Sequence, residues 1–321
     1  MMSAAVNILE VANLQIVARI AGRDYIAIDN VSFNVAAGHA RGLVGESGSG
    51  KSLTLRAIMG LLPSNVRVTS GSIIFRGTDL LADKGKYRKS VLGTGISMVF
   101  QEPSVALNPV MKIGKQITDS LVEHSDLNRR QARERAIDLM DQVGIRDPQK
   151  RVDDFPFQLS GGMKQRVMIA AAIACGPELI LCDEPTTALD VTIQAQIIDL
   201  FKKLRSELKV SLLYVTHDIG VVAELCDAIS VMYSGRIVEQ ADDINKVFSH
   251  PKHPYTQALL SAIPRIDGPI ERLKGLENTA PSLTHRSQEL APPMTQVEPG
   301  WEIAPFEFAD LDQLWSSANH D

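Results

Sequence analysis

Short apolar runs recur along this chain, and each run is followed by polar or glycine residues. Runs of this kind predict buried β-strands. They occupy residues 40–45, 96–101, 179–182 and 210–217. Other stretches have helical spacing of their apolar residues, and they predict helices at residues 51–62, 110–124 and 128–145. Because predicted strands are interspersed with predicted helices, the pattern indicates an α/β fold.

A glycine-rich loop, GESGSGKS, joins the first of these strands to the first of these helices. It fits the pattern G-x-x-x-x-G-K-[ST], in which backbone N–H groups surround phosphate oxygens. Glycines let the chain curl tightly and let its amides approach a ligand. We expect Lys51 to contact the β- and γ-phosphates and Ser52 to bind Mg²⁺. The predicted nucleotide-binding residues of this loop are Gly45, Glu46, Ser47, Gly48, Ser49, Gly50, Lys51, Ser52 and Leu53.

Two acidic residues follow the apolar run at 179–182. In parallel sheets, ligands collect at the carboxyl ends of the strands. Asp183 is therefore predicted to hold Mg²⁺, and Glu184 to polarise a water aimed at the γ-phosphate. A strand that merely ends in two solvated acids is the plainer alternative, and the phosphate loop in the same chain makes it the weaker one.

Single polar residues end two further predicted strands. Gln101 ends the run that begins at residue 96, and His217 ends the run that begins at residue 210. Either residue alone would more often be an ordinary loop residue than a catalytic one. In combination with the phosphate loop and the two acids, His217 is predicted to contact the γ-phosphate. Gln101 is predicted to bind Mg²⁺ or to sense the nucleotide.

Composition narrows the range of functions. The chain has 321 residues, of which 45% are hydrophobic, so it can form one large domain or two modest ones. Its formal net charge of −5 argues against a general nucleic-acid-binding protein. We expect a soluble intracellular chain, because we find neither a membrane-spanning apolar run nor a secretory signal. Cys175, Cys182 and Cys226 lie in apolar surroundings and are predicted to be buried without chemical roles.

The order of these motifs resembles that of the ATP-binding cassette (ABC) superfamily. Between Gln101 and the two acids lies LSGGM, and after the acids comes ALD at residues 188–190. The resemblance implies a P-loop NTPase cassette, with a RecA-like core, an antiparallel β subdomain and an inserted helical subdomain. The implied division is a core at 1–105 and 166–265, a helical subdomain at 106–165 and a C-terminal extension at 266–321.

The LSGGMKQR segment at 159–166 can form a second anion site. Ser160 can cap the helix that follows, while Gly161 and Gly162 expose backbone amides at its positive end. In the superfamily, two cassettes pack head to tail, and this loop closes on the ATP of the partner. The resemblance therefore implies an ATP-binding role in trans for Ser160, Gly161, Gly162 and Asp190. Residues 188–190 would line the dimer seam.

Tyr25 is the candidate for contacting the adenine base. The superfamily places an aromatic ring upstream of the phosphate loop, and Tyr25 is the aromatic residue before Phe33 in GRDYIAIDNVSF. Stacking requires only a π-face in the right place. Tyr25 could equally be part of a strand surface.

The segment SHPKHPYTQALLSAIPR at 249–265 resembles the oligopeptide and dipeptide import ATPases. That family implies ATP hydrolysis at the cytoplasmic face of the bacterial inner membrane, by a peripheral subunit coupled to peptide uptake. The implied partners are a second ABC ATPase subunit, identical or paralogous, two multispanning permease subunits and an extracytoplasmic solute-binding protein. Nucleic acid is not an expected partner. Nickel or another small solute is the alternative cargo, and a soluble ABC ATPase acting on ribosomes or DNA is the alternative class.

The C-terminal part departs from the family in one respect. Many members continue into a segment with four cysteines that hold an iron–sulfur cluster, but this chain has no cysteine after Cys226. We therefore expect ATP and Mg²⁺ as cofactors and no iron–sulfur cluster. The segment at 299–315 contains both tryptophans among acidic residues. It is predicted to pack back on the cassette as a strand or short helix, and a docking segment is the alternative.

Overall fold

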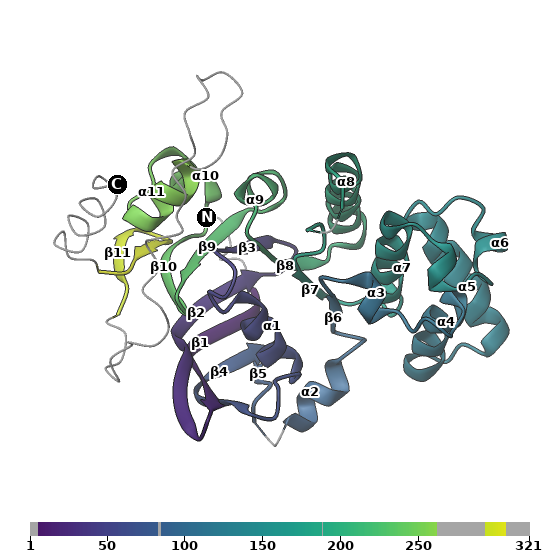
Figure 1. The fold of residues 1–321 in the computed structure, drawn as a ribbon, viewed down its shortest axis with the longest axis horizontal. Coiled ribbons are helices and arrows are strands. Elements are labelled where there is room, and N and C mark those ends of the chain that lie inside the picture. The colour runs from purple at the N-terminus through teal and green to yellow at the C-terminus, as the bar shows by residue number, and fades with distance from the viewer. Residues whose placement is uncertain (1–5, 83–84, 188, 262–292, 306–321) are drawn as a thin grey trace. The chain divides into compact units, whose positions relative to one another are not determined.

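The computed structural model describes residues 6–82, 85–187, 189–261 and 293–305. They form two structural units that interleave along the sequence (Figure 1). The first contains Leu80–Val215 with two short N-terminal stretches, and the second contains Leu9–Asn34, Arg41–Asp79 and the chain from Thr216 onward. These units do not coincide with the predicted core, helical subdomain and extension, so that division stays a prediction.

Parallel strands form the centre of the first unit. They are β6 (Ile96–Val99), β7 (Leu179–Asp183) and β8 (Ser211–Thr216), with β7 between the other two. Every residue of these strands is buried, as expected for parallel strands that are covered on both faces. The apolar runs thus predicted all three strands, and the observed strands end one or two residues before Gln101 and His217.

The helices of the first unit include the two amphipathic ones that the sequence predicted. Helix α4 packs against α5 and α7, and α5 also packs against α7 (Figure 1). Asn128 starts α5 by accepting hydrogen bonds from the N–H groups of Arg130 and Gln131. The helices are α2 (Lys86–Val91), α3 (Pro103–Ala106), α4 (Ile113–His124), α5 (Arg129–Gln142), α6 (Pro148–Arg151), α7 (Gly161–Ile173), α8 (Val191–Leu208) and the 3₁₀ helix Pro156–Gln158.

An antiparallel sheet forms one part of the second unit, with the strand order β2-β1-β4-β5. Leu9 of β1 lies opposite Phe75 of β4, and both side chains are buried. This sheet is the antiparallel element that the resemblance implied. The strands are β1 (Asn7–Ile20), β2 (Arg23–Ala36), β4 (Val66–Phe75) and β5 (Thr78–Asp79).

The rest of the second unit is built on β3 (Ala40–Val44), which pairs in parallel with β9 (Ala228–Tyr233). Strand β10 (Arg236–Ala241) continues this sheet antiparallel to β9. The hairpin β11 (Thr295–Glu298) and β12 (Trp301–Ile303) then pairs with β10 through β12. The helices of this unit are α1 (Lys51–Met59), α9 (Ile219–Leu225), α10 (Ile244–Ser249) and α11 (Pro254–Ser261).

The hairpin β11–β12 confirms that the described part of the acidic, tryptophan-containing segment packs back on the fold. Trp301 is only 3% exposed, and it lies opposite Ala241 of β10. The remainder of the segment, from residue 306, lies outside the described residues.

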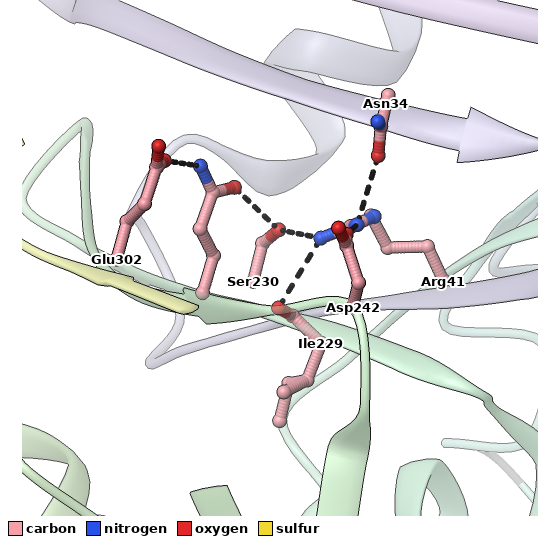
Figure 2. A network of polar contacts seen from close by, with 7 residues as sticks. Asn34, Arg41, Ile229, Ser230, Asp242 and Glu302 are labelled. Carbon is pink, nitrogen blue, oxygen red and sulfur yellow. Dashed lines mark hydrogen bonds and ion pairs between the residues drawn. The ribbon is translucent and has the colours of Figure 1, made fainter. Parts of the chain in front are cut away.

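A polar network joins the strands of this sheet (Figure 2). Arg41 is buried, donates to Asn34 and Ser230 at 2.9 and 3.0 Å, and forms an ion pair with Asp242. Ser230 donates to Gln240, which in turn donates to Glu302 of β12. Burial lowers the pKa of Arg41, and Asp242 opposes this change. The network fixes β12 to the strands that carry the phosphate loop.

Candidate functional site

The predicted phosphate loop lies between β3 and α1, and two of its glycines are required by their surroundings. Gly45 has a φ of 155°, and a Cβ there would lie 2.0 Å from the carbonyl oxygen of Met232. Gly50 has a φ of 107°, and a Cβ there would lie 2.3 Å from Ile28. Larger residues would therefore be both strained and obstructed at these positions. Gly50 also forms the N-cap of α1, so this helix begins where the sequence predicted.

The side chain of Lys51 lies inside this loop. Its Nζ donates to the carbonyl oxygens of Gly45 and Glu46 at 2.7 and 2.8 Å, and the residue is 4% exposed. Carbonyl oxygens compensate a buried ammonium group, which would otherwise be costly to remove from water. The loop thus holds a positive charge at the N-terminal end of a helix, which is the arrangement that binds phosphate.

Residues distant in sequence form hydrogen bonds with the backbone of this loop. The N–H of Gly235 donates to the carbonyl oxygen of Ser49 at 2.8 Å. The N–H of Glu46 donates to the hydroxyl of Tyr255 at 3.2 Å. Burial raises the pKa of the Glu46 carboxyl, and Lys51 opposes that shift. Sequence reasoning missed the contact of Tyr255, because the only signal was its position in the segment at 249–265.

The two predicted acids lie at the end of β7 in the first unit, and both are buried. Asp183 is the last residue of the strand. Glu184 has a φ of 44°, so the backbone turns sharply there, and its N–H donates to the carbonyl oxygen of Val215. This left-handed conformation is uncommon for residues other than glycine, and such outliers concentrate at functional sites. The plainer reading of two solvated acids is therefore wrong.

Polar groups fix the carboxylate of Glu184. Thr187 donates from its hydroxyl to Oε2 at 2.9 Å, and Nε2 of Gln101 lies 3.5 Å from the same oxygen. The structure thus brings Gln101 and Glu184 together, as predicted from their positions after two parallel strands. Thr187 was missed, although it lies three residues after Glu184 in the same acidic motif.

The predicted Mg²⁺ ligands are Ser52, Gln101 and Asp183. Hydroxyl, amide and carboxylate oxygens are the donors that Mg²⁺ prefers, and it commonly takes one or two carboxylates with waters and substrate phosphates. Over the parts of the chain that the structure describes, no three His, Cys, Asp or Glu side chains form a metal cluster. The donor types of these three residues therefore suit Mg²⁺; Ser52 belongs to the second unit, and Gln101 and Asp183 belong to the first.

The LSGGM segment starts α7 as predicted. The hydroxyl of Ser160 accepts a hydrogen bond from the N–H of Met163 at 3.4 Å, which makes Ser160 the N-cap. The two glycines that follow differ. A Cβ at Gly162 would lie 2.8 Å from Ile193 of α8, whereas a Cβ at Gly161 would meet, among the described residues, only Leu189, at 3.9 Å. Packing against the described residues thus explains Gly162 but not Gly161.

The remaining predicted residues lie on exposed or capping positions. His217 is exposed directly after β8, and Tyr25 is exposed on β2, so both of its interpretations stay open. Asp190 caps α8 by accepting from the N–H of Ile193 at 3.0 Å. Ala188 lies outside the described residues. Each described helix is too short or too polar to span a bilayer.

Comparisons with protein families give two matches. Residues 28–187 match the ABC transporter model, and residues 238–289 match the model of the oligopeptide/dipeptide transporter C-terminal region. The dipeptide transport ATP-binding protein DppD of Lactococcus lactis subsp. cremoris is 41% identical over 94% of this chain and 90% of its own. DppD of Escherichia coli is 49% identical over 79% of this chain and 78% of its own. The oligopeptide transport ATP-binding protein OppD of Bacillus subtilis is 45% identical over 87% of this chain and 78% of its own.

Solved structures resemble the fold as well. One is the ATP-binding cassette MJ0796, determined as a dimer in a post-hydrolysis state with ADP and Pi. Its TM-score is 0.65 at 27% identity, over 72% of this chain and 97% of that one. Another is CbiO1 of Clostridium perfringens, part of the ABC transporter complex CbiONQ. Its TM-score is 0.64 at 27% identity, over 76% of this chain and 91% of that one.

Proposed function

The chain belongs to the ABC transporter family, among the ATP-binding proteins of dipeptide and oligopeptide transport, and we propose that it powers peptide uptake by hydrolysing ATP. It is an ABC-type ATPase and the energy-coupling subunit of an importer. Two similarities support the peptide assignment. The similarity to DppD of Lactococcus lactis covers 94% of the chain, and residues 238–289 separately match a C-terminal region named for peptide transporters.

ATP is bound by its phosphates at the loop Gly45–Ser52. The backbone amides of the loop and the ammonium of Lys51 supply the positive potential for the β- and γ-phosphates. Lys51 exchanges its two carbonyl partners, Gly45 and Glu46, for phosphate oxygens when the nucleotide enters. Tyr25 stacks on the adenine ring.

Hydrolysis uses the group of polar residues at the end of β7. Glu184 accepts a proton from a water whose oxygen attacks the γ-phosphorus, while the bond from that phosphorus to the ADP oxygen breaks. Thr187 and Gln101 hold the carboxylate in place, which supports this role. His217 contacts the γ-phosphate. Ser52, Asp183 and Gln101 would hold Mg²⁺, which would neutralise negative charge on the phosphates.

A second anion site acts on the ATP of a partner cassette. Ser160 orders the first turn of α7, and the amides of Gly161 and Gly162 lie at its positive end. No described residue gives a packing reason for Gly161, and this supports the proposal, because a ligand from outside the chain would then require the small residue. Asp190 and its neighbours line the seam between the two cassettes.

The transporter as a whole contains more subunits than this chain. We place the chain at the cytoplasmic face of the bacterial inner membrane, together with a second cassette, two permease subunits and an extracytoplasmic binding protein. Selectivity for the peptide resides mainly in the binding protein and the pore. Nickel or another small solute is the alternative cargo for the same machinery.

Purification of the tagged chain from detergent-solubilised membranes, followed by mass spectrometry, tests this proposal. We expect two multispanning subunits and a second cassette to accompany it. After reconstitution with the binding protein, di- or oligopeptides should stimulate ATP hydrolysis and Ni²⁺ should not. Stimulation by Ni²⁺ alone would overturn the peptide assignment, and recovery of ribosomal or DNA-repair proteins without membrane subunits would overturn the importer.

A further inference from the structure

Helix α11 begins beside the phosphate loop, and Tyr255 lies in its first turn. The hydroxyl of Tyr255 accepts a hydrogen bond from the backbone N–H of Glu46 at 3.2 Å. Its ring packs against Tyr233 at the end of β9, with the ring centroids 4.4 Å apart. We infer that Tyr255 is a positioning residue for ATP binding, which acts by fixing the Gly45–Glu46 peptide group, so that the phosphate loop keeps the shape that receives the phosphates. This inference rests on the proposed role of the phosphate loop.

The peptide group between Gly45 and Glu46 links the two side chains. Its carbonyl oxygen, on Gly45, accepts from Nζ of Lys51 at 2.7 Å. Its N–H, on Glu46, donates to Tyr255. In a trans peptide these two groups point in opposite directions, so the peptide plane is fixed from both sides. Glycine restricts its backbone dihedral angles least of all residues, so the Gly45–Glu46 peptide plane needs contacts of this kind to fix its orientation.

A buried carboxylate fixes the position of Tyr255 itself. Glu239 of β10 is 0% exposed and accepts from the N–H groups of Lys252 and His253 at 2.9 and 3.0 Å. The indole N–H of Trp301 donates to the same carboxylate at 3.0 Å. The peptide that leads into α11 is therefore attached to the sheet, and the network of Figure 2 fixes the neighbouring residues of β10 and β12.

The hydroxyl group of Tyr255 is suited to a hydrogen bond that does not change with pH. Burial raises the pKa of Tyr255 well above its usual range, and the charge of Glu46 adds to this shift. The side chain therefore stays a neutral phenol over the pH range in which ATP is hydrolysed. The region after the cassette, which the peptide transporters share, thus contributes directly to the nucleotide site.

The test compares Tyr255→Phe with wild type in the full-length chain. The variant keeps the ring and loses only the oxygen. Loss of one hydrogen bond should weaken ATP binding roughly two- to tenfold, measured by titration. In the assembled transporter, KM for ATP should rise by a similar factor while kcat falls much less. Hydrogen exchange of the peptide that contains Glu46 should be faster than in wild type.

Thr256→Val is the matched control. Thr256 is the next residue of α11, is buried, and its hydroxyl has no hydrogen-bond partner among the described residues. This control should bind ATP like wild type. An equal loss in both variants, an unchanged Kd in Tyr255→Phe, or a fall in kcat at unchanged KM would overturn the inference. If Tyr255→Phe binds ATP like wild type, Lys51→Ala shows which claim is wrong. Normal ATP binding by Lys51→Ala would mean that the phosphate-loop assignment is wrong. Loss of ATP binding in Lys51→Ala would mean that only the role of Tyr255 is wrong.

Discussion

The positive charge of Lys51 lies among carbonyl oxygens of its own loop, at distances of 2.7 and 2.8 Å. Such oxygens stabilise the ammonium less than a doubly charged phosphate pair would, because they carry only partial charges. In the proposed binding mode, ATP therefore replaces weaker partners of Lys51 with stronger ones. At the scale of single residues, we expect this exchange to contribute most of the loop's affinity for the nucleotide.

Replacement of Lys51 by alanine should weaken ATP binding by roughly a hundredfold, because charge-assisted contacts to phosphate contribute about 1.5–3 kcal/mol each. Titration with a fluorescent ATP analogue measures the affinity. Arg56→Ala is the control, since Arg56 is an exposed cation on the same helix. Equal affinities for Lys51→Ala and Arg56→Ala would contradict the assignment.

The side chain of His253 is predicted to make stability depend on pH. Burial lowers its pKa from 6.5 to about 4, and its Nδ1 accepts from the N–H of Tyr255 at 3.2 Å. The unfolded chain binds the proton more readily, so stability is full above about pH 6.5 and is lost as the pH falls towards about 4.

His253→Asn provides the comparison, because asparagine can keep an acceptor near the Tyr255 N–H without titrating. Urea unfolding at about pH 7 and about pH 4.5 should show a smaller loss of stability in this variant than in wild type. A loss of the same size in both proteins would mean that other groups cause the pH dependence.

At the scale of elements, the start of α7 combines two glycines with different surroundings. Gly162 faces α8, where Ile193 leaves no room for a Cβ, whereas a Cβ at Gly161 would make an ordinary contact with Leu189 and with no other described residue. A β-branched side chain such as Ile193 has little rotamer freedom with which to make room. The first glycine is thus available for a ligand, and the second is required for packing.

Alanine substitutions should separate these two roles. Gly162→Ala should lower the free energy of unfolding by about 1–3 kcal/mol through overpacking. Gly161→Ala should leave stability unchanged or raise it by up to about 1 kcal/mol, because alanine favours helices. It should nevertheless reduce ATP hydrolysis by the assembled transporter. Chemical denaturation and a steady-state ATPase assay measure the two effects, and full activity of Gly161→Ala would contradict a role in trans.

At the scale of the whole molecule, the proposed site residues are divided between the two units. Lys51 and His217 belong to the second unit, while Gln101, Ser160 and Glu184 belong to the first. The proposed role of Ser160 adds a partner cassette to this arrangement. ATP hydrolysis would then require two cassettes to associate, because Lys51 would bind the ATP of its own chain and Ser160 would contact the ATP of the partner cassette.

Glu184→Gln should preserve ATP binding and abolish hydrolysis, since an amide cannot accept the proton from water. The unhydrolysed ATP should then hold two cassettes together. Light scattering after size-exclusion chromatography at saturating ATP should show a dimer, either of this chain or with the second cassette recovered from membranes. Adding Ser160→Arg should restore the monomer. A monomer in the single variant would contradict the shared site.

Much of this molecule follows from the local order of residues. The apolar runs predicted β3, β6, β7 and β8, because a strand buried on both faces needs apolar side chains at successive positions. The phosphate loop and the cap at Ser160 were predictable for a similar reason, since their geometry depends on neighbours within a few residues. The helix α1 ended at Gly60, earlier than predicted, because Gly60 adopts a left-handed conformation that terminates it.

Only the tertiary structure decided the contacts between distant segments. Glu46 and Tyr255, for example, are 209 residues apart. No periodicity or motif specifies which hydroxyl meets which amide over such separations, because the pairing results from how the strands and helices pack. The left-handed backbone conformation of Glu184 could not be predicted from the sequence for the same reason, because the surrounding structure imposes a conformation that glutamate rarely adopts.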